Sequence, residues 1–442
     1  MLKSVVLALV LQGAVPAGRG LEVPYSQFTL PNGLHVILHE DHTVPLVTVN
    51  VWYHVGSARE KPGRTGFAHL FEHLMFMGSK NAKYGEFDRL LEAAGGTNNA
   101  STAEDRTNYY IDVPSNALDL ALFLESDRMA YLIEAMSPKT VDAQRDVVKN
   151  ERRQSFENAP YGMSSIEIGE MLYPKGHPYH WPIIGYMEDL TAASYEDVVE
   201  FFRTYYQPAN ASMVIAGDID PVKTRAAVEK WFADVKPAKA LPPPIEYPRP
   251  VLNEVRKKTI QDQVQLPRLY LTWLTPAHFA PGDAELDVLS SLLAGGKNSR
   301  LYKRLVYDLQ IAQDVSAYQE SKALNSEYQV IVTARPNADI AKIRTIVDEE
   351  IAKIQREAPA EREFRRAINQ IESSFYNRME RVGDFGGVGD QLNGYYLAAG
   401  NPGYFNEDLS RYLALSATDI MVAAARFLPL DKRVELIVEP KK

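Results

Sequence analysis

One short stretch, residues 66–78, constrains this chain most, because it carries a His-x-x-Glu-His pattern at His69, Glu72 and His73. In a helix the two histidines lie at i and i+4, so their imidazoles project from one face and can share a divalent ion. The Glu72 carboxylate reaches the same region. The surrounding residues are almost wholly apolar, and unpaired polar groups are costly to bury there. The pattern therefore indicates a metal site, and a pair of hydrogen-bonded core histidines is the alternative.

This helix supplies only two ligands, whereas a hydrolytic zinc site needs a third protein ligand and one open position. The chain has no cysteine, so the third ligand must be a histidine or a carboxylate. A charged helix predicted from Val141 to Glu157 offers Glu151 as our candidate. Spacing alone does not select it over two acids on the same helix and two histidines in a turn-rich stretch: Asp146, Glu157, His177 and His180.

Length and composition indicate a soluble protein of two domains. The chain has 442 residues, of which 45% are hydrophobic and 24% are charged, and this length exceeds one ordinary core. A net charge of −9 argues against nucleic-acid binding. The proline-rich residues 236–250 predict a linker, which separates an N-terminal zinc-bearing domain at residues 21–235 from a C-terminal domain at residues 251–442.

The N-terminus, residues 1–20, is typical of a secretory signal peptide. Lys3 precedes an apolar run at residues 4–11, and small residues lead to a possible cleavage site at Ala17. We therefore expect a periplasmic or secreted protein, or a cytoplasmic one if the segment is not a signal. The run is too short to span a bilayer, and no later stretch is long enough. The absence of cysteine fits an oxidising compartment without requiring one.

Strand and helix patterns occur in a similar order in both halves. In the first half, a hairpin is predicted from Tyr25 to Leu38, and residues 97–102 can form an edge strand that pairs with an extended peptide. In the second half, a strand from Val264 to Thr272 precedes a helix from Asp283 to Leu293. This order suggests duplication. The second half has no His-x-x-Glu-His motif, and the helix at Asp283 stands where the metal helix would be.

Five segments together resemble the M16 (pitrilysin, or inverzincin) metallopeptidases, in the short form that includes the mitochondrial processing peptidase. The resemblance covers nearly the whole chain from about Tyr25 onward, and the segments that carry it are residues 30–34, 66–78, 95–100, 145–151 and 206–210. The resemblance implies an α+β fold of two homologous domains, each a mostly antiparallel sheet with helices packed on one face. It also implies a clam-like arrangement that encloses the substrate.

The resemblance further implies a zinc-dependent endopeptidase that hydrolyses peptides or unfolded polypeptides. One Zn²⁺ per chain would be held by His69, His73 and Glu151, with Glu72 as the general base. Asn99 and Ala100 match the segment whose backbone pairs with substrate. The family often has another acid where this chain has Gln144.

A second departure concerns an Arg and a Tyr that active single-chain relatives carry in the second domain. Those positions fall on Val306 and Gln313, and Arg304 and Tyr307 lie nearby but out of register. The chain thus resembles the zinc-bearing subunit of paired enzymes. It implies a homologous partner that lacks zinc and supplies the Arg and Tyr. A non-catalytic M16-like scaffold and a peptide-binding subunit are the alternatives.

Overall fold

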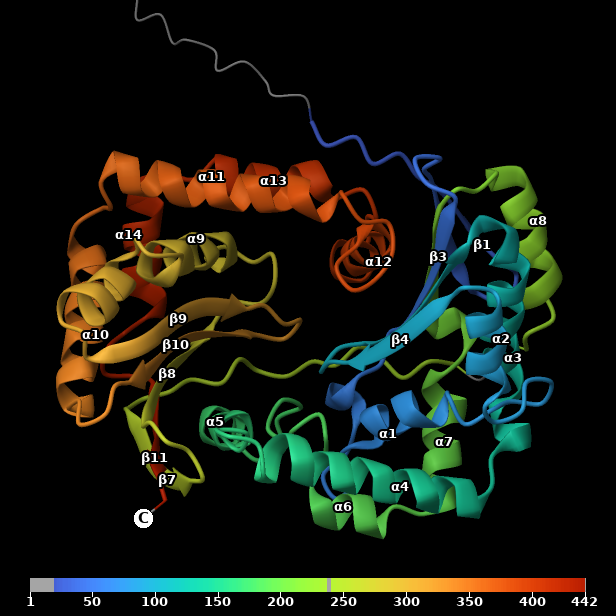
Figure 1. The fold of residues 1–442 in the computed structure, drawn as a ribbon, viewed down its shortest axis with the longest axis horizontal. Helices are drawn as coiled ribbons and strands as arrows, with labels where there is room; N and C mark the ends of the chain where they lie inside the picture. The colour runs from blue at the N-terminus through green and yellow to red at the C-terminus, as the bar shows by residue number, and fades with distance from the viewer. Residues whose placement is uncertain (1–19, 237–239, 442) are drawn as a thin grey trace, which may run out of the picture.

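The computed structural model describes residues 20–236 and 240–441 as two α+β halves that lie side by side (Figure 1). The predicted signal peptide, residues 1–20, falls outside the described residues except for Gly20. Part of the predicted linker, residues 237–239, also falls outside them. Among the residues described, no helix combines the length and apolar character that crossing a membrane requires.

The N-terminal half contains a six-stranded sheet in which all neighbouring strands are antiparallel except β2 and β6. In spatial order the strands are β1 (Ser26–Thr29), β2 (His35–Glu40), β6 (Ala211–Gly217), β3 (Leu46–Tyr53), β5 (Thr107–Pro114) and β4 (Thr97–Thr102). The predicted first hairpin is confirmed, with Gly33 at a φ of 93° in its turn. Strand β4 lies at the edge of the sheet.

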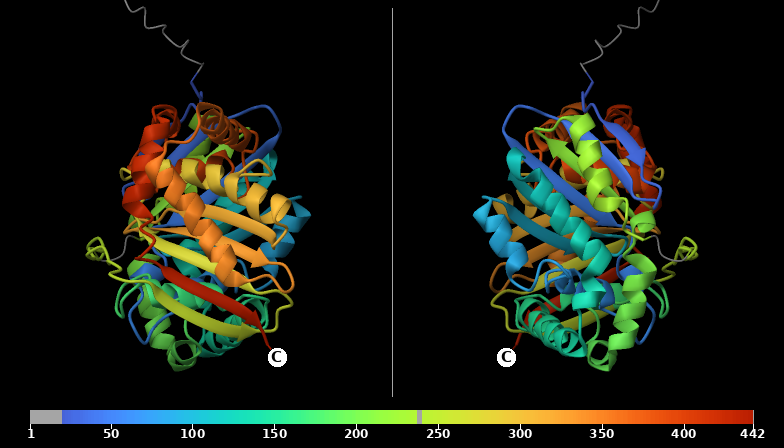
Figure 2. Two further views of the ribbon diagram at one scale, coloured as in Figure 1. Left: turned by 90° about the vertical axis from the view of Figure 1, so that its left-hand side faces the viewer. Right: turned by 90° about the vertical axis from the view of Figure 1, so that its right-hand side faces the viewer.

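Alternation along β3 explains why helices cover one face of this sheet. Val47, Val49 and Val51 enter the main core, whereas the intervening Thr48, Asn50 and Trp52 point to the opposite face. Helices α3 and α8 lie over the outer face (Figure 2). The helices of this half are α1 (Phe67–Leu74), α2 (Glu86–Ala93), α3 (Leu118–Ala135), α4 (Pro138–Arg152), α5 (Ser164–Leu172), α6 (Met187–Ala192), α7 (Tyr195–Tyr205) and α8 (Pro221–Phe232).

The C-terminal half repeats this sheet without the equivalent of β1, which confirms the predicted duplication. Its spatial order is β7 (Arg256–Asp262), β11 (Val434–Pro440), β8 (Arg268–Thr275), β10 (Ser326–Ala334) and β9 (Ala312–Glu320). Again one pair, β7 with β11, is parallel and the others are antiparallel. The helices are α9 (Asp283–Ala294), α10 (Ile340–Arg356), α11 (Glu361–Arg378), α12 (Val388–Ala399), α13 (Phe405–Leu413) and α14 (Ala417–Phe427).

Two details of the sequence prediction were wrong in this half. The strand predicted from Val264 to Thr272 begins only at Arg268, and the strands β7 and β9 were not predicted. Both missed strands lie at the edges of the sheet and carry polar residues on both faces. Such strands lack the alternation on which sequence reading depends.

Each half contributes one helix that packs on the sheet of the other half. Helix α5 packs on β8 and β11, and α12 packs on β3 and β6 (Figure 1). The apolar cluster around α12 combines Val388 and Leu392 with Ile37, Val214 and Ala216 of the N-terminal sheet. Because apolar residues of both halves share these clusters, the two halves form one packed body.

Candidate metal centre

Helix α1 is fixed at its start by a buried carboxylate. Oxygens of Glu60 accept hydrogen bonds from the backbone N–H groups of Gly66 at 2.9 Å and Ala68 at 2.8 Å. These are among the donors that a helix start leaves without a partner in the helix. Gly66 has a φ of 86°, which favours glycine. The helix therefore begins at a defined residue, which sets the direction of every side chain after it.

The apolar face of α1 orients the two histidines of the motif. Leu70, Phe71 and Leu74 are fully buried in the core of the N-terminal half. His69 and His73 project from the other side, and their side chains are 12% and 24% exposed. Their ring centroids lie 4.8 Å apart. The i, i+4 pair thus faces a solvent-accessible region rather than the core.

The structure brings Glu151 of α4 to these two histidines. Nε2 of His69 lies 3.6 Å from Oε1 of Glu151, and Nε2 of His73 lies 3.1 Å from its Oε2. One potential ligand atom from each residue lies within 4.8 Å of the other two. No other group of three such residues forms within residues 20–236 and 240–441.

The competing candidates have other contacts. On α4 and the π-helical turn that follows it, Asp146 pairs with Lys149 at 3.5 Å, and Glu157 pairs with Arg152 at 3.2 Å. His177 is buried and stacks on Tyr173 with ring centroids 4.5 Å apart. Nδ1 of His180 lies 2.9 Å from the carbonyl oxygen of Tyr173. None of these four residues joins the cluster of His69, His73 and Glu151.

The charge states of the cluster suit a divalent cation. Burial, together with the neighbouring His73, lowers the pKa of His69 to about 4. The hydrogen bond with His73 holds the pKa of the Glu151 carboxyl below its ordinary value. Neutral imidazole and ionised carboxylate are the forms that bind metals. Two nitrogens and one oxygen at a partly exposed site fit zinc with one open position.

Glu72 lies beside this cluster and is held by a residue that sequence reasoning missed. The hydroxyl of Thr102, at the end of β4, donates a hydrogen bond of 2.6 Å to Oε2 of Glu72. Burial raises the pKa of the Glu72 carboxyl. A carboxyl with a raised pKa beside a candidate metal site can both accept and return a proton. No local sequence signal links Thr102 to Glu72, because the contact joins a strand to a helix.

Strand β4 presents a free edge at Asn99 and Ala100. The backbone N–H of Ala100 donates to Oδ1 of Asn99 at 2.8 Å rather than to β5. Since N–H groups alternate along an antiparallel strand, the N–H groups of Asn98 and Thr102 also face outward. This edge can accept one more extended strand.

Val306 and Gln313, which stand where the family pattern has an Arg and a Tyr, cannot supply the charge or the hydroxyl of those residues. Val306 is partly buried against the C-terminal core, and Gln313 is exposed on β9. Arg304 pairs with Glu350 at 2.8 Å on α10, so its charge is already matched. At the N-terminal half, Nε2 of Gln144 contacts Sδ of Met77 at 2.9 Å.

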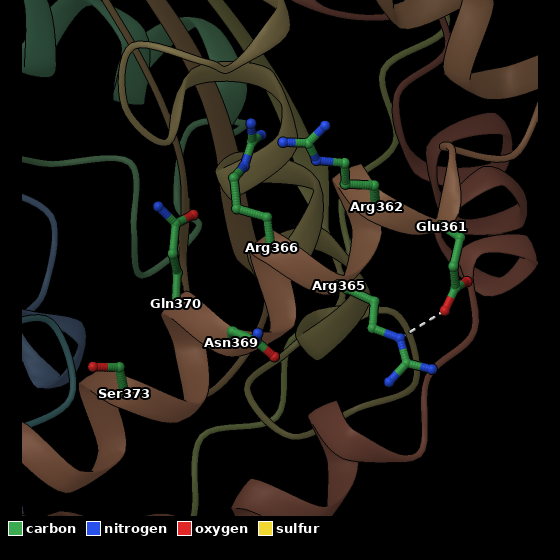
Figure 3. Close-up of a pocket in the computed structure, with 7 residues that line it drawn as sticks. All are labelled: Glu361, Arg362, Arg365, Arg366, Asn369, Gln370 and Ser373. Carbon is green, nitrogen blue, oxygen red and sulfur yellow. Dashed lines mark hydrogen bonds and ion pairs between the residues drawn. The ribbon is translucent and has the colours of Figure 1, made fainter.

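Neither of two hollows found among the described residues is lined by the three candidate ligands. One, of about 870 Å³, follows the exposed face of α11, where Arg365 pairs with Glu361 at 2.7 Å (Figure 3). The other, of about 1050 Å³, lies between the halves and is lined by residues of both, including Trp52 and Lys322. None of the sequence-predicted site residues lines either hollow.

Fold and site together define a two-domain α+β protein of duplicated strand order, and within residues 20–236 and 240–441 a candidate metal centre occurs in the first half only. The chain belongs to peptidase family M16. Residues 35–163 match the family model described as Insulinase (Peptidase family M16), and residues 192–371 match the one described as Peptidase M16 inactive domain.

Individual relatives agree with this assignment. The chain is 30% identical to the zinc protease PqqE of Helicobacter pylori over 98% of this chain and 96% of that protein. It is 25% identical to an uncharacterized zinc protease of Streptomyces coelicolor over 90% of this chain and 85% of that protein. The crystal structure of a protease from Helicobacter pylori superimposes with a TM-score of 0.88 at 28% identity, covering 95% of this chain and 100% of that chain.

Proposed function

We propose that this chain is the metal-bearing subunit of a zinc-dependent endopeptidase that hydrolyses peptides or unfolded polypeptides. The observation that carries the proposal is the convergence of His69, His73 and Glu151 beside the partly buried carboxyl of Glu72. Two nitrogens, one carboxylate and an adjacent proton acceptor are the groups that metal-assisted hydrolysis needs. Membership of peptidase family M16 and relatives named zinc proteases support it.

In the proposed mechanism, His69, His73 and Glu151 would hold one Zn²⁺. When bound, zinc would activate water and polarise the peptide carbonyl. Glu72 accepts the proton of the attacking water and passes it to the leaving amine. The Thr102 hydroxyl holds Oε2 of Glu72 in place, and Oε1 would face the substrate. Three residues thus bind the metal, Thr102 orients Glu72, and Glu72 moves the proton.

The substrate would lie along the free edge of β4. Outward backbone groups at Ala100 and its alternate neighbours supply hydrogen bonds that do not depend on substrate side chains. Such binding requires an extended peptide, so a folded protein would be a poor substrate. We therefore infer that peptides and unfolded segments are the substrate class.

We further propose that a homologous chain, without the metal motif, completes the enzyme by supplying an Arg and a Tyr. The support is that Val306 and Gln313 stand at those positions in this chain, and that Arg304 is engaged by Glu350. The active form would then be a heterodimer. We also propose, from the signal-like residues 1–20, that the protein is exported to the periplasm or secreted.

Purification from the native cells tests these proposals together. We expect one zinc per chain, a co-purifying homologous chain, and peptidase activity on an unstructured peptide that the separated chain lacks. The N-terminal sequence of the purified protein reports cleavage of the leader. A chain without stoichiometric zinc would be a scaffold or a peptide-binding subunit instead, and full activity of the isolated chain would remove the need for a partner.

A further inference from the structure

The turn that joins β4 to β5, residues 103–106, is held by the C-terminal half. Nζ of Lys322 lies 2.7 Å from Oε1 of Glu104 in this turn and 2.8 Å from Oε1 of Glu327. Lys322 belongs to the loop between β9 and β10, and its side chain is only 9% exposed. An ion pair with so little solvent is screened less by salt than a surface pair.

A second set of contacts holds the same turn. Oδ2 of Asp105 accepts a hydrogen bond from the backbone N–H of Ala323 at 3.0 Å, and Asp105 also accepts one from the hydroxyl of Tyr179. The oxygen of Tyr179 in turn accepts the N–H of Leu324 at 3.0 Å. The loop between β9 and β10 therefore contacts the turn through a side chain and through its backbone.

The turn has little room to move on its other side. The N–H of Ala58 donates to the carbonyl oxygen of Glu104 at 2.9 Å. A Cβ atom at Gly56 would lie 2.1 Å from the carbonyl oxygen of Ala103, so backbone packs directly on backbone there. If the turn is displaced, the ends of β4 and β5 that it joins must therefore move with it.

The strand residue next to the turn is Thr102, which holds Glu72. Nη1 of Arg106, the last residue of the turn, donates to the carbonyl oxygen of Ser101 at 2.9 Å and so ties the end of β4 to the turn. A continuous set of contacts thus runs from Lys322 through Glu104 to Thr102 and Glu72. It links the C-terminal half to the half that carries the candidate metal cluster.

We propose that Lys322 is a positioning residue for the peptidase site of the other half, acting through Glu104 and the turn at residues 103–106 on Thr102 and on the edge of β4. The inference rests on the proposed function. It gives the C-terminal half a role in the chemistry of this chain's own site, besides any role in enclosing substrate.

The charge balance explains why a lysine is needed at this point. Three carboxylates, Glu104, Glu320 and Glu327, lie within 3.5 Å of Nζ of Lys322. Without the ammonium group, Glu104 of one half and Glu327 of the other would be left as like charges in a poorly solvated place. The contact between turn and loop would then weaken and would depend on the hydrogen bonds of Asp105 alone.

The test compares Lys322→Met with a matched variant, Lys258→Met, in the complete active assembly. Lys258 of β7 also pairs across the two halves, with Glu167 of α5, but it does not contact the turn. For Lys322→Met we expect unchanged zinc content, faster amide hydrogen exchange across residues 97–106, and a fall in kcat of about tenfold or more. Lys258→Met should change neither the exchange of this segment nor kcat.

A second pair of variants separates positioning from general damage. Thr102→Val removes the hydroxyl that holds Glu72 and should lower kcat with zinc retained, whereas Thr102→Ser should restore most of the rate. If Lys322→Met does not fold, Glu104→Gln, which removes the other charge of the pair, takes its place with the same expected exchange and kcat changes.

The outcomes distinguish this inference from the proposed function. A wild-type assembly that binds no zinc or cleaves no peptide contradicts the proposed function, and the inference falls with it. An active wild type, with exchange and kcat unchanged in Lys322→Met or in its substitute, overturns the inference alone. Loss of zinc in Lys322→Met would also overturn it, because the contacts described here lead to Glu72 and not to the metal ligands.

Discussion

Nε2 of His73 lies 3.1 Å from Oε2 of Glu151, although one residue belongs to α1 and the other to α4. This contact, with that of His69 to the same carboxylate, makes the cluster a candidate metal centre rather than a pair of core histidines. It also provides the first prediction, since each of the three residues offers one potential ligand atom.

We expect Glu151→Gln and His73→Ala to lose stoichiometric zinc while keeping the fold. An amide oxygen is a weaker zinc ligand than a carboxylate, and alanine offers none. Metal content after dialysis, with circular dichroism as a check of folding, measures this. Glu157→Gln is the matched control, because Glu157 follows the same helix and pairs with Arg152 rather than with the two histidines. Retention of zinc by Glu151→Gln would exclude Glu151 as a ligand.

Glu72→Gln should keep the metal and lose turnover by about 10²–10⁴-fold, which is the usual contribution of a general base. Glutamine can still accept the hydrogen bond from Thr102, so the local packing changes little. The measurement is kcat of the complete assembly on an unstructured peptide, with zinc quantified in the same sample. A wild-type rate in this variant would show that another group takes the proton.

If substrate binds along the edge of β4, variants of this strand should weaken substrate binding without changing the catalytic step. Asn98→Pro removes one outward-facing N–H and leaves the buried side chain of Ala100 unchanged. Proline is tolerated at such a position, because the N–H of an edge strand faces away from the sheet there. We expect KM to rise several-fold with little change in unfolding temperature. Asn99→Pro, which removes an N–H facing β5, should instead lower the unfolding temperature; equal effects of the two variants on KM and stability would contradict edge binding.

A pH effect on stability is expected from Asp287 of α9. Burial raises the pKa of its carboxyl to about 7, and Oδ2 accepts a hydrogen bond from the hydroxyl of Tyr412 at 2.7 Å. Between the ordinary value of 3.8 and about 7, the folded chain binds more protons than the unfolded chain. The contribution of this group to stability is therefore fully present below pH 3.8 and is lost as pH rises towards 7.

Asp287→Asn keeps an acceptor for Tyr412 and removes this dependence on pH. A difference of about three pKa units corresponds to at most about 4 kcal/mol. The variant should therefore be more stable than the wild type at pH 8, by up to that amount, and should lose this advantage near pH 4. Denaturant unfolding of both proteins at the two pH values measures it, and a difference that does not change with pH would contradict the assignment.

Local patterns in the sequence predicted much of the fold. The turn at Gly33, the alternating valines of β3 and the apolar spacing of α1 depend on neighbours along the chain, and a reader of the sequence can see those neighbours. The strands β7 and β9 could not be predicted in this way. Their polar residues form strands because the sheet offers free edges there, and that depends on distant parts of the chain.

The sequence by itself determined that two imidazoles and a carboxylate share one turn of helix, because the i, i+4 spacing and the apolar face are local properties. Only the tertiary structure decided which acid joins them. Glu151 stands one turn after the buried Val148, so the packing of α4 against α1 directs it to the histidines, while Asp146 stays exposed on the same helix. The contacts of Thr102 and Lys322 were likewise invisible in the sequence, because they join segments that meet only when the sheets and the two halves pack.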